Sequence, residues 1–234
     1  MLAILKKEFK GYFMSPIGYI FVGVFTFLAS MFFSSGVLMY QQADISLVFS
    51  NINLVYLFLV ALLTMRLLSE EKNKKTDQLL LTAPISVTEI VLGKYLAAMS
   101  VFGITLLVSF AYPAIMFMFG EPVISEIIGS YLGFILLWGA FIAVGLFISA
   151  LTESQVIAGV FTFASLLMIY FISWFESSIN IVIVKKILGW FSLFSRYNEF
   201  QSGILDISSV IYYLSFIFVF LFLTIRVIDK RRYS

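Results

Sequence analysis

Residues 66–94 have the sequence RLLSEEKNKKTDQLLLTAPISVTEIVLGK, and they divide a chain that is otherwise almost entirely apolar. Nine of these 29 residues are charged. Charged side chains are costly at the centre of a bilayer, so this segment must lie in water. The segment therefore predicts a loop outside the membrane, and the apolar regions on either side of it set the fold.

The composition is that of an integral membrane protein. Hydrophobic residues make up 62% of the chain, charged residues 12%, and the mean hydropathy is +1.05. Soluble domains are about half apolar and about a quarter charged. No polar block is long enough to bury a separate core, which predicts one membrane domain over residues 1–234.

The chain contains no Cys and no His. Disulfides, thiolate nucleophiles, imidazole bases and nearly all zinc or haem ligation are therefore excluded. We expect this chain to bind no metal or cofactor, to have no catalytic residues and to bind no nucleic acid.

Residues 1–16 predict an amphipathic helix in which apolar residues recur at helical spacing beside lysines. The apolar residues are Leu2, Leu5 and Phe9, and the lysines are Lys6, Lys7 and Lys10. One interpretation is a helix in the headgroup layer, and the other is a basic flank that orients the first span. The apolar run that follows is longer than the roughly 7–15 residues of a signal-peptide core.

The charge-free runs predict an all-α fold with six transmembrane helices, because about 20 apolar residues cross the hydrocarbon core. The predicted spans are residues 17–39, 52–68, 95–119, 129–151, 156–175 and 207–226. Pro113 lies within the third span, where it can kink the helix while a neighbouring helix satisfies the freed carbonyl. Four polar residues near span ends favour interfacial anchoring: Asn51, Asn53, Tyr112 and Gln155.

Residues 176–206 predict helices at the outer interface of the membrane. Their two apolar pieces flank Lys185 and Lys186, and each piece is too short to span. One helical face contains Ile183, Ile187, Trp190, Phe191 and Phe194, and Trp190 and Tyr197 are expected near headgroup level. A seventh span is the alternative, and it would bury two lysines and place the C-terminus outside.

The positive charges predict the orientation of the six spans. Twelve Lys and Arg residues fall on the side that holds both termini and the 69–94 loop, whereas Lys185, Lys186 and Arg196 fall on the other side. Cytoplasmic segments carry the excess of Lys and Arg, so the termini and the loop are expected in the cytoplasm.

The 69–94 loop predicts two helices joined by a turn. Residues 72–82 favour a short helix with an apolar side, and Pro84 disfavours helix at the preceding residue. Ser86 followed by Glu89 is a capping box at the start of a helix that continues into the third span. Such a loop can transmit a push to the membrane, or it can be an ordinary solvated connector.

Small residues recur at four-residue intervals in the fourth span. The pairs are Gly129 with Gly133, Gly139 with Ala143, and Gly145 with Ser149. Small residues let helix backbones approach closely, within a chain or between subunits. Glycine is also common in membrane helices in general, so the pattern alone identifies no partner helix.

The loop resembles the coupling-helix signature of the permease subunits of type-2 ABC exporters. The matching residues are Glu70, Glu71, Lys72, Thr76, Leu79, Leu80, Ala83, Pro84, Ile85, Ser86, Glu89, Ile90, Val91, Gly93 and Lys94. The layout of the whole chain is similar too, and the segment from Gly203 to Asp206 with Tyr212 to Leu214 resembles the family's ending. Within the family, the chain is most similar to the gliding-motility-associated permease branch.

The resemblance implies a permease without a nucleotide site, coupled to a separate cytoplasmic ATPase that binds ATP and Mg. The chain indeed contains no GxxxxGK[ST] motif. The implied ATPase-docking residues are Glu70, Glu71, Lys72, Thr76, Leu79, Leu80, Ala83, Pro84, Ile85, Ser86 and Glu89. A second permease copy or a homologous permease, the cytoplasmic membrane of a prokaryote and outward movement of a substrate are also implied.

Three other functions compete with this one. A scaffold or sensor subunit would engage the same ATPase without transport. A secondary transporter would need ionisable groups for ion coupling within the membrane, and the cores of the six predicted spans contain no Asp, Glu, Lys or Arg. An intramembrane enzyme would need a Ser/His dyad, an HExxH site or paired carboxylates in the membrane, and no such arrangement is present. The residues do not specify the substrate.

Overall fold

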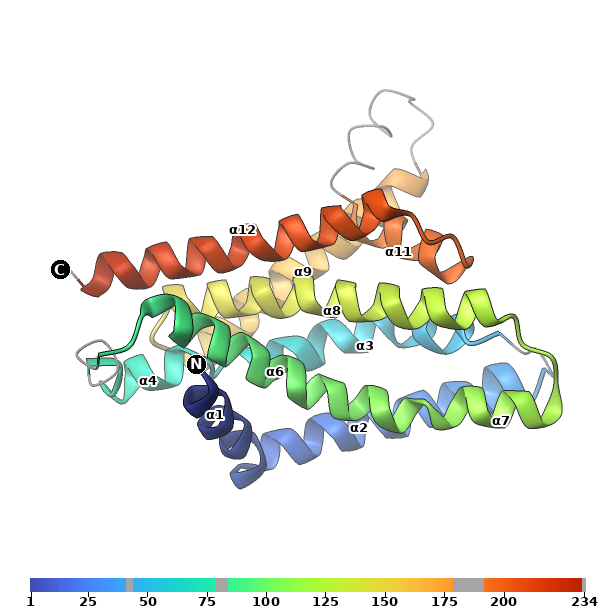
Figure 1. Cartoon of the computed structure of the whole chain (residues 1–234), viewed down its shortest axis with the longest axis horizontal. Coiled ribbons are helices and arrows are strands. Elements are labelled where there is room, and N and C mark those ends of the chain that lie inside the picture. Colours follow the sequence, from blue (N-terminus) through green and yellow to red (C-terminus); the bar gives the residue numbers. More distant parts are fainter. Residues whose placement is uncertain (41–43, 79–83, 179–191, 233–234) are drawn as a thin grey trace.

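The computed structural model describes residues 1–40, 44–78, 84–178 and 192–232. Within these ranges the regular structure is helical throughout, and the long helices form one elongated bundle (Figure 1). In chain order the elements are α1 (Leu2–Met14), α2 (Pro16–Phe32), the π-helix η1 (Phe33–Leu38), α3 (Ser46–Thr64), α4 (Ser69–Asn73), α6 (Val87–Ser109), α7 (Ala111–Phe119), α8 (Ile124–Leu151), α9 (Gln155–Ser178), α11 (Leu193–Gln201) and α12 (Ile207–Arg232).

Six helical segments of the described chain are long and apolar enough to cross a membrane. They are Pro16–Leu38, Ser46–Asn73, Val87–Phe119, Ile124–Leu151, Gln155–Phe175 and Ile207–Arg231. The prediction of an all-helical chain with six membrane-length helices is therefore confirmed.

The second long helix begins earlier than the predicted span at residue 52. α3 starts at Ser46 because the polar side chains near its start are satisfied within the protein. Asn51 donates through its side-chain nitrogen to the carbonyl of Leu47 at 2.7 Å, and Ser50 lies 3.0 Å from the amide nitrogen of Gln201 in α11. These polar residues therefore belong to the helix and do not mark its end.

Pro113 interrupts the third long helix, as its position predicted. α6 ends at Ser109 and α7 begins at Ala111, so the break precedes the proline by one turn. A proline has no N–H for the carbonyl four residues before it, which here is the carbonyl of Ser109. The Tyr131 hydroxyl of α8 donates to that oxygen at 2.7 Å. A neighbouring helix thus replaces the lost hydrogen bond.

α8 is the centre of the bundle. Its span is 72% buried, against 17% for the α9 span and 22% for the α12 span. The Trp138 ring of α8 stacks on Phe102 of α6 with ring centres 4.4 Å apart, and it meets Tyr56 of α3 edge-on at 4.8 Å. Because lipid is as apolar as these side chains, close packing is what holds this region together.

Glycines let three other elements approach α8. A Cβ atom on Gly129 would overlap the carbonyl oxygen of Phe200 in α11, and one on Gly145 would overlap the Thr64 side chain of α3. A Cβ atom on Gly133 would lie 2.8 Å from the Phe200 Cβ, and one on Gly139 would lie 2.9 Å from the Tyr95 hydroxyl of α6. The structure therefore places all four glycines against helices of the same chain.

Two tyrosines expected at the membrane interface are packed inside the protein. Tyr112 is 6% exposed, stacks on Phe33 and lies 3.0 Å from the Ser30 hydroxyl. Tyr197 of α11 is fully buried, and its ring packs near that of Phe134 in α8. Side-chain contacts with neighbouring helices thus replace the expected headgroup contacts. The predicted interfacial residues Ile183, Ile187, Trp190 and Phe191 lie outside the described residues.

Both termini lie at the same end of the bundle as α4 and the start of α6 (Figure 1). We call this the charged end and define it as residues 1–15, 65–78, 86–94, 149–155 and 226–232. α1 runs across the long direction of the bundle there, and it packs against α6 and α2 (Figure 1). Chain segments far apart in sequence therefore meet at the charged end.

Candidate functional site: the charged end and the loop between α3 and α6

The first helix of the loop is shorter than the predicted helix at residues 72–82, and it starts earlier. α4 covers Ser69–Asn73, after which the chain turns at Lys75, whose φ is +56°. The Thr76 N–H donates to the Glu71 carbonyl at 2.9 Å, and the Lys75 N–H donates to the Lys72 carbonyl at 3.1 Å. This is the Schellman arrangement that ends helices, formed here without the usual glycine. The prediction of one continuous helix is therefore wrong at Lys74 and Lys75.

Lys94, the last residue of the quoted segment, is buried at the start of the third span. Its ammonium group is 3.0 Å from a Glu8 carboxylate oxygen of α1 and 2.8 Å from a Glu71 oxygen of α4. It also donates to the Leu67 carbonyl at 2.6 Å. One fully buried ammonium group thus joins α1, α4 and α6.

Lys7 supplies a second positive charge to this cluster. Its ammonium group is 3.2 Å from a Glu71 oxygen and 3.8 Å from a Glu8 oxygen, and its side chain is 64% exposed. Two carboxylates therefore face two ammonium groups, one inside the protein and one at its surface. Charges that leave water need such pairing.

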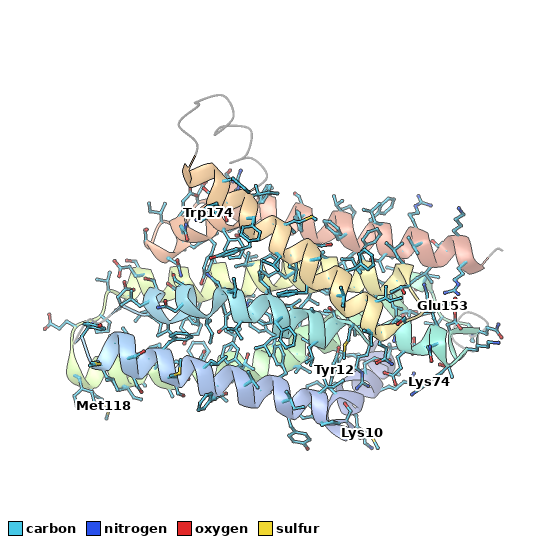
Figure 2. All side chains as sticks on the ribbon, turned by 180° about the vertical axis from the view of Figure 1, so that it is seen from behind. Lys10, Tyr12, Lys74, Met118, Glu153 and Trp174 are labelled. Carbon is cyan, nitrogen blue, oxygen red and sulfur yellow. The ribbon has the colours of Figure 1, made fainter. Side chains whose placement is uncertain are left out.

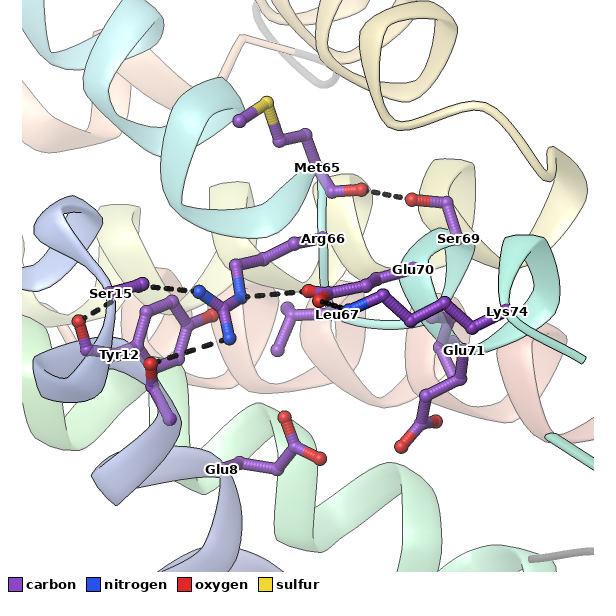
Figure 3. Close-up of polar contacts among 12 residues, drawn as sticks. Glu8, Tyr12, Ser15, Met65, Arg66, Leu67, Ser69, Glu70, Glu71 and Lys74 are labelled. Atoms are coloured by element: carbon purple, nitrogen blue, oxygen red, sulfur yellow. Dashed lines mark hydrogen bonds and ion pairs between the residues drawn. The ribbon is translucent and has the colours of Figure 1, made fainter. Parts of the chain in front are cut away.

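Arg66 forms a second junction beside the first, between the end of α3 and α1 (Figure 3). Its guanidinium donates to the Ser15 hydroxyl at 2.6 Å and lies 3.3 Å from a Glu70 oxygen. It also covers the ring of Tyr12 at 5.2 Å. Burial raises the pKa of the Tyr12 phenol well above its usual range, so the phenol stays protonated and donates to the Leu63 carbonyl at 2.8 Å.

Side chains from other elements satisfy the carbonyls where α3 ends. The last carbonyls of a helix have no partner within it and carry partial negative charge. Tyr12 donates to Leu63, the Ser69 and Ser149 hydroxyls donate to Met65, and Lys94 donates to Leu67. The end of the second span is thereby attached to α1, α4, α6 and α8.

α4 is also attached to the end of α8. The Ser149 hydroxyl oxygen accepts from the N–H of Leu68 at 3.0 Å and from that of Ser69 at 3.1 Å. Lys72 donates to the carbonyl of Ala150. Ser149, one of the small residues spaced four apart in the fourth span, therefore holds the beginning of the loop.

The capping box at the start of α6 is confirmed. The Glu89 N–H donates to the Ser86 hydroxyl at 3.2 Å, and the Ser86 N–H donates to the Glu89 carboxylate at 3.4 Å. The N-terminal ammonium group of Met1 lies 3.3 Å from the same carboxylate. α6 thus begins at the loop and is continuous with the third span up to Ser109.

The structure separates the predicted docking residues into two groups. Glu70, Glu71 and Lys72 face other parts of this chain, and the two glutamate side chains are only 25% and 13% exposed. Thr76, Pro84 and Ser86 are exposed, and Ile85 and Glu89 are half-buried. The remaining predicted residues, Leu79, Leu80 and Ala83, lie outside the described residues.

Glu8 and Tyr12 are site residues that the sequence did not single out. Together with Ile4 they form an i, i+4, i+8 stripe on α1, and Ile4 is packed against Gly93 of α6. Glu8 is the only acidic residue of this lysine-rich helix, and it was the sequence signal that could have identified the stripe. The predicted face of Leu2, Leu5 and Phe9 is a different side of α1, and Leu2 is 67% exposed.

The charged end is a junction of paired charges between helices. Within the described ranges, no group of three or more carboxylate, imidazole or thiolate side chains could hold a metal ion. The charges of the Lys94 cluster are compensated by one another and by a backbone carbonyl, and these contacts fix α1, α4 and α6 relative to one another.

A comparison with protein families agrees with this architecture. Residues 19–228 match the model of a family described as ABC-2 family transporter protein. No curated protein matches the chain. Because the family match extends from the first span to the end of the last one, the chain belongs to the ABC-2 family of transporter membrane proteins.

Proposed function

We propose that the chain is the permease subunit of an ATP-binding-cassette exporter, and that a separate cytoplasmic ATPase subunit docks on its loop between α3 and α6. The ATPase would bind the ATP and Mg, and a second permease copy or a homologous permease would complete the membrane part. The proposal extends the family assignment by naming the direction of transport, the partner and the docking site.

The proposal rests on how the base of the loop is attached to the rest of the chain. Its base is held to α1, α6 and α8 by the contacts of Lys94, Arg66 and Ser149. Further along the loop, Thr76, Pro84 and Ser86 are exposed. A force applied to the exposed part is thus passed to the start of α6 and to the ends of α3 and α8.

Because this chain itself holds the base of the loop, we propose two different roles for the predicted docking residues. Thr76, Leu79, Leu80, Ala83, Pro84, Ile85 and Ser86 form the surface offered to the ATPase. Glu70, Glu71 and Lys72 are positioning residues that hold this surface, since their charged groups are engaged by this chain. Glu89 positions the start of α6 through the capping box.

The distribution of charge supports a cytoplasmic location for the charged end. Both termini and the loop lie there (Figure 1), and so do twelve of the 15 Lys and Arg residues of the chain. Cytoplasmic segments of membrane proteins carry this excess, so we propose that both termini lie in the cytoplasm. The cytoplasmic membrane of a prokaryote is proposed from the resemblance to type-2 ABC exporters.

Site-specific crosslinking in cells tests the docking surface. A photoreactive amino acid replaces Thr76 at the charged end or, as a matched control, Met118, which is 78% exposed at the opposite end (Figure 2). We expect an ATP-binding-cassette ATPase to be captured from position 76 and not from position 118. Capture from neither position, or equally from both, would overturn the docking assignment.

A second readout separates transport coupling from scaffolding. The ATPase captured at position 76 is purified with and without the permease, and its rate of ATP hydrolysis is measured in lipid vesicles. An exporter requires the rate to change when Pro84 is replaced by Ala, because the turn is then altered. An unchanged rate with intact binding favours a scaffold or sensor subunit.

A further inference from the structure

A basic hollow lies beside the charged end, where the end of α8, the turn into α9 and the end of α12 meet. Its volume is about 300 Å³, at the lower limit of pockets that hold small molecules. Its lining residues are Lys72, Ala150, Leu151, Glu153, Val227, Lys230 and Arg231. Figure 2 shows Glu153 at this end of the bundle, on the same side as Lys74.

The lining of the hollow is positively charged. It contains three cationic side chains, those of Lys72, Lys230 and Arg231, and one anionic side chain, that of Glu153. Arg231 lies 2.6 Å from a Glu153 oxygen and 3.8 Å from an Asp77 oxygen, while Lys72 donates to the Ala150 carbonyl. The cations therefore outnumber the anion of the lining, and contacts within the chain hold Arg231 and Lys72 in place.

The other lining residues of the hollow, Ala150, Leu151 and Val227, are apolar, and exposed apolar side chains lie nearby in the chain. Leu151 is 58% exposed, and Val156 at the start of α9 is 72% exposed. The α9 and α12 spans are the least buried of the six described spans. The hollow thus presents cations next to helices whose outer surfaces suit acyl chains.

We propose that this hollow binds the phosphodiester headgroup of an anionic phospholipid from the cytoplasmic leaflet. Lys230 and Arg231 contact the phosphate oxygens, Lys72 adds its charge from the inner wall, and the acyl chains lie along α9 and α12. Basic pockets between membrane helices on the cytoplasmic side suit such headgroups. The bound phosphate replaces Glu153 as the partner of Arg231.

Free phosphate shares this chemistry, but the exposed apolar side chains nearby favour the lipid. The choice of leaflet rests on the orientation given in the proposed function, whereas the contacts of the site itself do not involve the ATPase. Its occupant would bridge the end of α12 and the α8–α9 turn, which Arg231 and Glu153 join in the structure.

Lipid retention by the purified chain tests the proposal. The chain in detergent is incubated with equal amounts of phosphatidylglycerol and phosphatidylcholine, and bound lipid is counted by native mass spectrometry. We expect preferential retention of phosphatidylglycerol, which millimolar inorganic phosphate and soluble glycerophosphate do not displace. Equal retention of the two lipids, or displacement by the soluble anions, would contradict a lipid site.

Three substitutions locate the bound lipid. Lys230→Gln should lower phosphatidylglycerol retention about five-fold, while Lys10→Gln, which removes an exposed charge of α1, should leave it unchanged. Glu153→Gln should raise retention, because it removes the competing carboxylate, and a misfolded variant would not show such a gain. Equal losses for the two lysine variants, or no gain for Glu153→Gln, would overturn the proposal. The proposal would also be overturned if Lys230→Gln lost ATPase crosslinking at position 76 but retained its lipid.

Discussion

The middle of the bundle and its charged end are held together in opposite ways. Around Trp138 the contacts are between rings, such as the stack on Phe102 at 4.4 Å, and the indole nitrogen of Trp138 has no hydrogen-bond partner among the described residues. Around Lys94 each contact joins one named donor to one named acceptor. Packing depends on volume and shape, whereas the charged end depends on the identity of each partner.

Under the function proposed above, the two regions would have different tasks. A packed middle can shift between arrangements if its volume is conserved. A junction of paired charges keeps a fixed geometry, because separating the charges without new partners is costly. The charged end is thus suited to transmit a displacement that the middle accommodates.

Removing the central cation should have the largest effect. Lys94→Met leaves Glu8 and Glu71 partly buried with only the exposed ammonium group of Lys7, and it should lower the free energy of unfolding by about 3–5 kcal/mol. Unfolding in detergent by a denaturant titration measures the loss. Lys10→Met, at an exposed position of the same end, should change stability by less than about 0.5 kcal/mol. Equal effects of the two variants would contradict the importance of the cluster.

Adding one methyl group to α8 should have the next largest effect. In Gly129→Ala the new Cβ atom overlaps the Phe200 carbonyl oxygen, and α11 must move, at a cost of about 1–3 kcal/mol. Gly103→Ala is the matched control, because no atom lies within 4 Å of its new Cβ atom. The control should gain up to about 1 kcal/mol from helix propensity. The comparison fails if both variants shift the unfolding midpoint alike.

A conservative change in the packed middle should cost less. Trp138→Phe removes ring volume but breaks no hydrogen bond, so we expect a loss of about 1–2 kcal/mol in the same denaturant titration. The neighbouring rings of Phe102 and Tyr56 can close part of the space. A loss as large as that of Lys94→Met would remove the contrast between the two regions.

A substitution in the turn after α4 should have a small effect that stabilises the chain. Lys75 has a left-handed backbone conformation, which glycine adopts without strain, so Lys75→Gly should stabilise the chain by about 1 kcal/mol. Lys74→Gly has no such gain, because Lys74 is in a right-handed conformation and pairs with Glu70 at 2.7 Å. A differential scanning measurement should rank Lys75→Gly above the wild type and Lys74→Gly below it.

The sequence predicts the features of this fold that depend on neighbouring residues. Hydropathy predicts the six long helices, the Ser86 and Glu89 spacing predicts the capping box, and Pro113 predicts the break in the third span. Each of these depends on residues within one or two turns of one another. Such patterns can be recognised without knowledge of the tertiary structure.

The features that the sequence does not predict depend on which helices meet. The contact of Glu8 with Lys94 joins residues 86 positions apart, and it depends on how α1 crosses α6. The break at Lys75 was missed because a lysine gives no signal for a left-handed conformation. Tyr112 was expected at the interface, because composition does not show that Ser30 and Phe33 lie beside it.

The central claim is that Glu71 holds the loop from inside and is not itself a contact of the ATPase. Crosslinking of the ATPase from position 76 in Glu71→Gln, in Lys94→Met and in the double variant tests this claim. If the two side chains act as one junction, each single change lowers the yield and the double variant loses no more than the worse single one. If the yield falls by the product of the two single effects, Glu71 acts separately from Lys94, and the internal role assigned to it is contradicted.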